Sequence, residues 1–145
     1  MEKSFLLVDA HNVIFARPPL SALHARSPEA ARGKLLQLLE QHQDASGTRV
    51  VAVFDGGSAK KPDTTLSGPA GVQIFYGQSA DAVIERLVVK YAAKHRLTVA
   101  TDDNLIRTAA VAAGASTMGV DELFGDMERA EKELGRTMEK LRRRR

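Results

Sequence analysis

Three short, mainly apolar runs of the sequence each end in an acid. The acids are Asp9 after residues 6–8, Asp55 after residues 50–54, and Asp102 with Asp103 after residues 97–101. Continuous apolar runs of this length are typical of strands buried on both faces. Because ligands of an open α/β sheet gather at the carboxyl ends of its strands, we expect these carboxylates to meet at one edge. There they would bind a metal ion or a polar substrate.

Two more acids fall on a helix that we expect to begin after Ser79. Asp81 is in its first turn, and Glu85 is four residues further on, on the same face. Both would join the site, or Asp81 would only interact with the helix dipole and Glu85 would be a solvated side chain. Asn12, three residues after Asp9, would orient Asp9, ligate a metal or contact a phosphate, or would only form an Asx turn.

The acids that follow strands also have structural interpretations. Asp9 would cap a backbone turn, Asp55 would anchor the following loop, and one of the pair at 102–103 would cap the next helix while the other faces the cleft. Converging carboxylates repel one another unless a cation or a proton binds. Oxygen ligands favour Mg²⁺ or Mn²⁺, so the chemistry that these residues predict is metal-assisted hydrolysis of a phosphodiester.

The elements that must position these acids alternate along the chain, which predicts a three-layer α/β/α domain with a mostly parallel sheet and right-handed crossovers. The stretch Ala16–Arg26, with Pro18-Pro19, and the stretch 55–71 are expected to be loops. Strands are expected over residues 5–8, 49–54, 72–76, 98–101 and 116–118. Helices are expected from Ser27 to Gly47, after Ser79, over 104–113, and from a cap at Asp121 towards the C-terminus.

Composition limits the classes of function. The chain has 145 residues, enough for one domain with a core, and no Cys, which excludes a disulfide framework, thiolate zinc sites and a Cys nucleophile. The net charge of +3 lies in residues 125–145, which hold 8 Lys/Arg and 5 Asp/Glu. His11 is a candidate substrate contact, whereas His42 and His95 are expected on polar faces of helices. Neither a P-loop nor a dinucleotide fingerprint is present.

Four motifs occur in order along the chain and together resemble one family. They are Leu6-Leu7-Val8-Asp9-x-x-Asn12, Val53-Phe54-Asp55, Ser79-Ala80-Asp81-x-x-Ile84-Glu85 and Val99-Ala100-Thr101-x-Asp103. This set is similar to the YacP-type NYN domain, a branch of the PIN-like nuclease superfamily, over residues 5–123. The resemblance implies a PIN-like fold, for which we predict the strand order 3-2-1-4-5, and a basic helical C-terminal extension.

The resemblance also implies Mg²⁺- or Mn²⁺-dependent endoribonucleolytic cleavage and, for some members, cleavage of mRNA on translating ribosomes. It assigns catalytic and metal-binding roles to Asp9, Asp81 and Asp103, with supporting positions at Asn12, Asp55 and Glu85. This sequence departs from the family pattern in three places. Asp102 stands where a small hydroxyl residue is usual and is a further candidate metal ligand, residues 104–107 lack a Glu-Gln pair, and His11 stands where Tyr is common.

We therefore predict a nuclease domain over residues 1–124 and a basic helical extension over 125–145. Single-stranded mRNA is the expected substrate and the ribosome an expected partner, while the oligomeric state stays open. The expected RNA contacts are His11, Lys60, Lys61, Arg142, Arg143, Arg144 and Arg145. The alternatives are a non-catalytic RNA- or ribosome-binding module, a hydrolase of small nucleotides, and a toxin-like nuclease.

The location of the protein is predicted from what its sequence lacks. No apolar run approaches the roughly 20 residues that a membrane-spanning helix needs. The N-terminus enters an expected core strand rather than a signal peptide. We therefore predict a cytoplasmic protein with no membrane partner.

Overall fold

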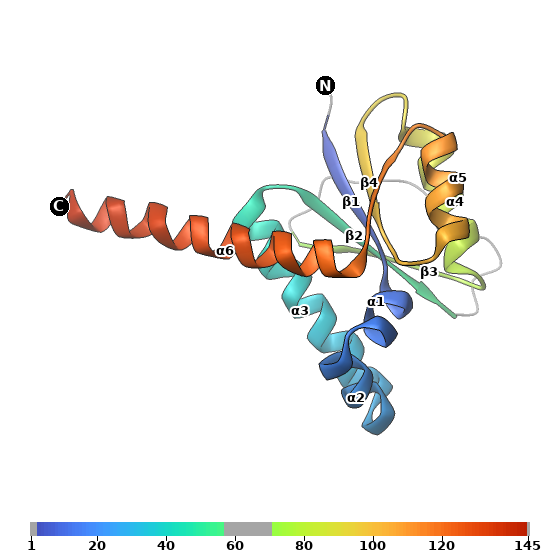
Figure 1. Cartoon of the computed structure of the whole chain (residues 1–145), viewed down its shortest axis with the longest axis horizontal. Coiled ribbons are helices and arrows are strands. Elements are labelled where there is room, and N and C mark those ends of the chain that lie inside the picture. Colours follow the sequence, from blue (N-terminus) through green and yellow to red (C-terminus); the bar gives the residue numbers. More distant parts are fainter. Residues whose placement is uncertain (1–2, 57–70, 145) are drawn as a thin grey trace.

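The computed structural model describes residues 3–56 and 71–144, and these form alternating strands and helices around one sheet (Figure 1). Lys60, Lys61 and Arg145 lie outside the described residues. In chain order, the elements are β1 (Ser4–Asp9), α1 (Ala10–Ala16), α2 (Pro18–Arg26), α3 (Pro28–Ser46), β2 (Arg49–Asp55), β3 (Gln73–Gly77), α4 (Ala80–Tyr91), β4 (Arg96–Ala100), α5 (Asn104–Ala112), β5 (Ser116–Met118) and α6 (Val120–Arg143).

The sheet has five parallel strands in the order β3-β2-β1-β4-β5, as the sequence predicted. β1 is the central strand, and its Val8 pairs with Ala52 of β2 on one side and Ala100 of β4 on the other. This register brings the carboxyl ends of β1, β2 and β4 to the same edge, so residues that follow these strands become neighbours.

The core has two halves, one on each face of the sheet. Successive strand side chains point to opposite faces, so Leu6 and Val8 pack with α1, α2, α3 and α6, whereas Phe5 and Leu7 pack with α4 and α5. Both halves are closed to solvent, which explains why the strand sequences are continuously apolar. The predicted three-layer α/β/α arrangement is confirmed (Figure 1).

Local sequence signals set the ends of several helices as predicted. Ser27 begins α3 by accepting a hydrogen bond from the Ala30 N–H at 3.2 Å, and Ser79 begins α4 by accepting one from the Ala82 N–H at 3.4 Å. Gly47 ends α3 in the left-handed conformation, with φ 75°, which glycine adopts without a steric penalty.

The prediction of a loop over residues 16–26 was wrong. α1 begins directly after Asp9, and α2 occupies Pro18–Arg26, with only Arg17 in an extended conformation between them. Pro18 and Pro19 start α2, because the first residues of a helix need no intrahelical N–H partner and proline already has a helical φ. Leu20 then anchors α2 in the core.

His42 also differs from its expected position on a polar face. Its side chain is buried, and burial lowers the pKa of its imidazole. Its Nδ1 has no hydrogen-bond partner among the residues that the structure describes. The residue helps to line a cavity between α3 and α6. The packing of these two helices, rather than the polarity of the imidazole, therefore determines its position.

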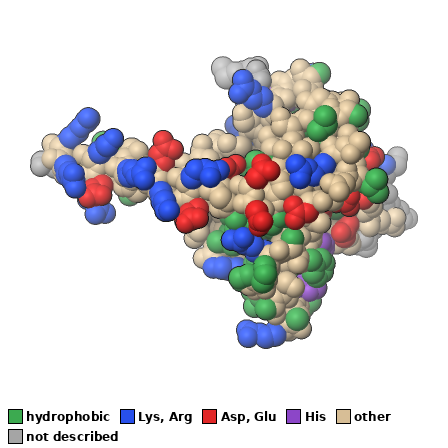
Figure 2. All heavy atoms as spheres, in the orientation of Figure 1, with side chains coloured by type: hydrophobic (Ala, Val, Ile, Leu, Met, Phe, Trp, Pro, Cys, Tyr) green, Lys and Arg blue, Asp and Glu red, His purple; other side chains and the backbone are tan. Residues whose placement is uncertain are grey.

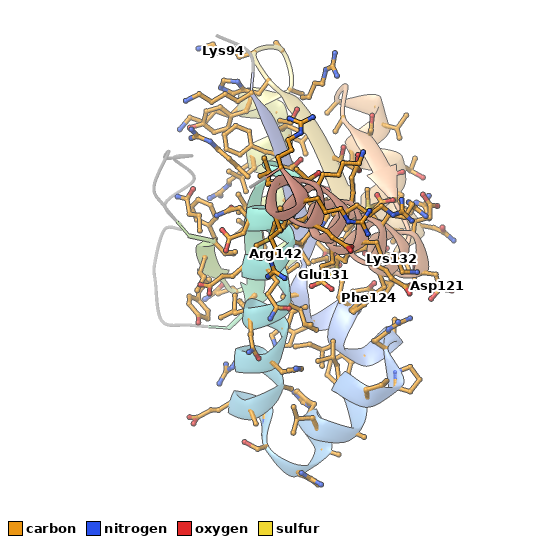
Figure 3. The ribbon with its side chains drawn as sticks, turned by 90° about the vertical axis from the view of Figure 1, so that its left-hand side faces the viewer. Lys94, Asp121, Phe124, Glu131, Lys132 and Arg142 are labelled. Carbon is orange, nitrogen blue, oxygen red and sulfur yellow. The ribbon has the colours of Figure 1, made fainter. Side chains whose placement is uncertain are left out.

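α6 begins in the core and ends as a projecting arm. Val120, Leu123 and Met127 are buried, whereas residues 131–144 are all exposed. Arg17 lies 4.1 Å above the ring of Phe124, near the start of the helix. Arg142 lies near the C-terminal end of the helix, which faces the viewer in Figure 3. The helix is continuous across residue 125, and the domain division placed there stays a prediction. None of the described helices is long and apolar enough to cross a bilayer.

Candidate active site

We call the carboxyl ends of β1, β2 and β4, with the start of α4, the acidic edge; its acids are Asp9, Asp55, Asp81, Asp102 and Asp103. Asp9 is its buried centre. It ends β1, and only 5% of its surface is exposed. Its Oδ2 accepts a hydrogen bond from the Thr101 hydroxyl at 2.9 Å. The same hydroxyl accepts one from the Asp103 N–H at 3.0 Å. Thr101 thus connects the carboxylate of β1 to the turn after β4.

Asp9 bears an unfavourable negative charge. Burial is the largest cause that raises its pKa, from the ordinary value of 3.8 to about 6. The Thr101 hydrogen bond opposes this rise, while the charges of Asp81, Asp55 and Asp103 add to it. The charges of four carboxylates, from β1, β2, α4 and the turn after β4, therefore act on one another.

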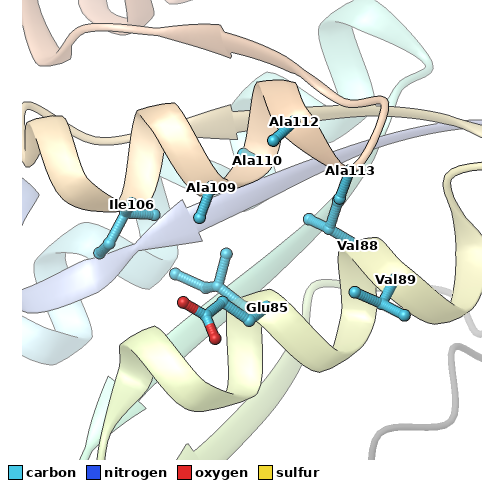
Figure 4. A pocket seen from close by; sticks show the side chains of 9 residues that line it. Glu85, Val88, Val89, Ile106, Ala109, Ala110, Ala112 and Ala113 are labelled. Carbon is cyan, nitrogen blue, oxygen red and sulfur yellow. The ribbon is translucent and has the colours of Figure 1, made fainter.

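Asp81 belongs to this group from the side of α4. Its side chain lies in the first turn, and desolvation raises its pKa, followed by repulsion from Asp103, Asp55 and Glu85. Glu85 acts on Asp81 but is not among the groups that shift the pKa of Asp9. It lines an apolar pocket of about 400 Å³ between α4 and α5 (Figure 4), so it lies at the margin of the site.

Three of the acids accept hydrogen bonds from backbone N–H groups at the N-termini of helices. Asp103 Oδ1 accepts from the N–H groups of Leu105 and Ile106 at 2.9 and 3.4 Å and so caps α5. Asp55 Oδ1 accepts from the Ala80 N–H at 2.6 Å, at the start of α4. Asp102 Oδ1 accepts from the Val120 N–H at 2.9 Å, at the start of α6. The structural and functional interpretations of these residues are therefore compatible.

The prediction that Asp121 caps the last helix was wrong. α6 begins at Val120, so Asp121 already lies inside the helix. Gly119 is the N-cap residue and has no side chain to accept a hydrogen bond. The Asp102 carboxylate supplies the missing acceptor from another part of the chain. A Cβ on Gly119 would lie 3.0 Å from Asp102 Oδ1, so glycine leaves the room that this contact needs.

We expect Asp102→Ala to lower the free energy of unfolding by about 1 kcal/mol, because the Val120 N–H loses its acceptor. Urea unfolding followed by circular dichroism measures the change. Glu122→Ala is the matched control, since Glu122 lies exposed in the same first turn. Equal losses in the two variants would show that Asp102 acts only through the charge near the helix end.

Asn12 and His11 fasten α1 to the same edge. Asn12 Oδ1 accepts a hydrogen bond from the Asp102 N–H at 2.8 Å, which ties α1 to the turn after β4. His11 Nδ1 accepts one from the Asp55 N–H at 3.1 Å. Since Nδ1 is then an acceptor, its 3.5 Å approach to Asp55 Oδ2 adds no hydrogen bond.

Thr101 is the site residue that sequence reasoning missed. It appears in the fourth motif, but only as the end of a strand. The signal in the sequence was a hydroxyl residue at the end of a buried apolar run. In the structure, β1 and β4 pair Val8 with Ala100, and this register places Thr101 beside Asp9. Arg142, Arg143 and Arg144 are not brought to this edge, because they lie at the far end of α6 (Figure 1).

The donor chemistry of the edge fits a divalent cation. All its acidic groups are carboxylates, the ligand type that Mg²⁺ and Mn²⁺ prefer. Burial raises the pKa values of Asp9 and Asp81 first, and the neighbouring carboxylates add repulsion that a cation would compensate. Within residues 3–56 and 71–144, however, no three acidic or histidine side chains are close enough to hold one ion. A bound ion would therefore have to draw these side chains together.

The five-stranded parallel sheet with acids at its carboxyl edge fits a nuclease-type α/β domain. The family model of the YacP-like NYN domain matches residues 6–145. The chain belongs to the YacP-like NYN domain family, which has a nuclease-type, RNA-binding fold.

Two kinds of relative agree with this assignment. The uncharacterized protein YacP of Bacillus subtilis is 32% identical over 139 residues, which cover 94% of this chain and 82% of that protein. Crystal structures of Rae1 (YacP) from Bacillus subtilis match with TM-scores of 0.76 and 0.74 at 30% and 32% identity. These matches cover 95% of this chain and 83% and 81% of the two crystallised chains of Rae1.

Proposed function

We propose that this protein is a divalent-metal-dependent endoribonuclease that hydrolyses phosphodiester bonds of single-stranded RNA. The observation that carries the proposal is the buried Asp9 carboxylate, with a pKa of about 6, surrounded by the charges of Asp81, Asp55 and Asp103. A domain that only binds a polyanion gains nothing from clustered carboxylates. A domain that activates water beside a phosphate does gain from them.

Asp9, Asp81 and Asp103 are the residues that would hold the metal, with Asp102 as a further candidate ligand. Bound Mg²⁺ or Mn²⁺ would lower the pKa of a water molecule and offset charge on the phosphodiester. Thr101 orients Asp9 through its hydroxyl. Asn12 and Asp55 support the edge by holding the backbone after β4 and the start of α4, and Glu85 adds charge beside Asp81.

The basic arm supplies phosphate contacts away from the acidic edge. Arg142–Arg145 would bind the RNA backbone with an affinity that falls with salt and has little sequence preference, and Lys60 and Lys61 are proposed to act in the same way. The blue side chains along α6 in Figure 2 show this distribution of charge. Because the arm and the edge are far apart, we extend the proposal to long substrates such as mRNA presented by a ribosome.

The test is cleavage of a labelled single-stranded RNA with Mg²⁺, Mn²⁺ or EDTA. We expect the wild type to cut only with a divalent ion, and Asp81→Asn to lose at least about tenfold of this activity, because it removes one of the charges that would hold the ion. Glu40→Gln, a charge removal on the exposed face of α3, is the control. Cutting in EDTA, or full activity of Asp81→Asn, would contradict the assignment.

A non-catalytic RNA- or ribosome-binding module is the second candidate, because Asp55, Asp102 and Asp103 already serve helix N-termini. This candidate predicts RNA binding with no cutting under any metal condition. Repeating the assay with translating ribosomes separates it from a nuclease that acts only on ribosome-bound substrate.

A further inference from the structure

Five aromatic rings form a row beside the carboxylates. They come from β3, β2, α1 and α2, so residues distant in sequence build one surface. In order, the centroid distances are 5.5 Å for Tyr76–Phe54, 5.6 Å for Phe54–His11, 6.2 Å for His11–Phe15 and 4.8 Å for Phe15–His24. We call these five residues the ring row.

The ring row borders the acidic edge directly. His11 is its middle member and lies two residues after Asp9. Its Nδ1 accepts the Asp55 N–H at 3.1 Å, and Asp55 is one of the charges that raise the pKa of Asp9. A ligand that contacts the row therefore lies next to the proposed reaction centre.

Two rings of the row are exposed to solvent, Tyr76 at one end and Phe15 next to His24 at the other. Phe54 is fully buried, but Phe15 is 58% exposed and Tyr76 is 44% exposed. The whole chain has only five Phe, two Tyr and no Trp, so three of its seven Phe and Tyr rings lie in this row. In Figure 2, purple histidine surface lies beside green hydrophobic surface over α1 and α2.

The chemistry of the proposed substrate fits these faces. Without a bound cation the carboxylates repel phosphates, so contacts to the bases would add affinity for RNA near the edge that does not depend on phosphate charge. Every nucleobase has a flat face that stacks on an aromatic ring, whatever its identity, and a base is free to do so only when it is unpaired. The half-buried imidazoles of His11 and His24 flank Phe15 and limit its movement.

We propose that Phe15, held by His11 and His24, is a stacking site for an unpaired base of single-stranded RNA, and that Tyr76 forms a second such site at the other end of the row. This inference rests on the proposed function, because it names how that site selects unpaired RNA. It assigns a substrate-binding role to three residues that no sequence motif indicated, namely Phe15, His24 and Tyr76.

The test measures RNA binding separately from cleavage. The full-length protein is titrated in EDTA against a fluorescent single-stranded oligoribonucleotide and against the same oligonucleotide with abasic positions. We expect Phe15→Leu, which keeps apolar bulk but removes the ring, to weaken binding about 5- to 100-fold. Phe15→Tyr should bind within about threefold of the wild type. Val111→Ala on α5 is the control, since Val111 is 59% exposed and outside the row.

The abasic probe identifies what Phe15 contacts. We expect the wild type to bind it more weakly than the intact RNA, and Phe15→Leu to show a smaller difference between the two probes, because only Tyr76 is left to stack on a base. Full affinity of Phe15→Leu, an equal loss on both probes, or no RNA binding by the wild type would overturn the stacking site. Ring-dependent binding with no cleavage of free RNA and none with translating ribosomes would support the stacking site and reject the nuclease, whereas cleavage that ignores the ring would do the reverse.

Discussion

Asp9→Asn is expected to reduce RNA cleavage by at least about 100-fold while RNA binding stays intact. Asparagine keeps the shape of the side chain and still accepts the Thr101 hydrogen bond, but it loses the negative charge proposed to hold the metal. Altering a group that only orients a metal ligand typically costs 10–100-fold, and removal of a ligand charge should cost at least as much. Initial rates on labelled RNA in Mg²⁺ or Mn²⁺ measure the effect.

Binding is compared by anisotropy in EDTA, where the proposed metal-dependent cleavage would not consume the probe. Asp44→Asn is the matched control, because it makes the same chemical change at an exposed position of α3. Metal-dependent cleavage that survives in rigorously purified Asp9→Asn would reject Asp9 as the centre of the site. Loss of both binding and cleavage would show instead that the variant disturbs the RNA surface.

The same substitution should stabilise the folded protein by about 2 kcal/mol at pH 7.5. Raising the pKa of a carboxyl from 3.8 to about 6 means that its ionised form costs the fold about 3 kcal/mol. Asparagine removes this charge, although its buried amide costs part of the gain. Urea unfolding of the wild type and Asp9→Asn measures the difference, with Asp44→Asn again as the control.

The stabilisation expected from Asp9→Asn depends on pH, because Asp9 titrates at a different pH in the folded and unfolded protein. Between pH 3.8 and about 6, the folded Asp9 binds more protons than the unfolded one, so its contribution to stability falls as pH rises through this window. The stability difference between Asp9→Asn and the wild type should therefore be small near pH 4, grow to pH 6.5 and then stay constant. A difference that does not vary with pH would contradict the burial of an ionisable Asp9, and added Mg²⁺ or Mn²⁺ should reduce the difference at pH 7.5.

The central features of the fold could be predicted because they depend on local, repeated signals. Buried parallel strands are continuously apolar, and capping residues such as Ser27 and Ser79 mark helix starts. The acids at strand ends could also be located, because parallel strands all direct their carboxyl ends to one edge. The family resemblance added the strand order, which local patterns do not specify.

Other features depend on contacts between distant residues. Pro18-Pro19 fits a loop and a helix start equally well, and only the packing of Leu20 decides between them. Asp102 was expected near a metal or at the next helix, but it caps α6, which begins 18 residues later. The ring row consists of isolated aromatic residues without a common motif, so nothing local relates Phe15 to Tyr76.

The residues that build the acidic edge are synthesised at different times during translation. Thr101, the donor of the hydrogen bond to Asp9, is made 92 residues after it. β1 forms the middle of the sheet, so until β4 emerges one side of β1 lacks its partner strand. A chain interrupted before residue 101 therefore has Asp9 but no assembled edge. The proposed cutting activity depends on this edge, so it would arise only after β4 and Thr101 have been made and have folded beside β1.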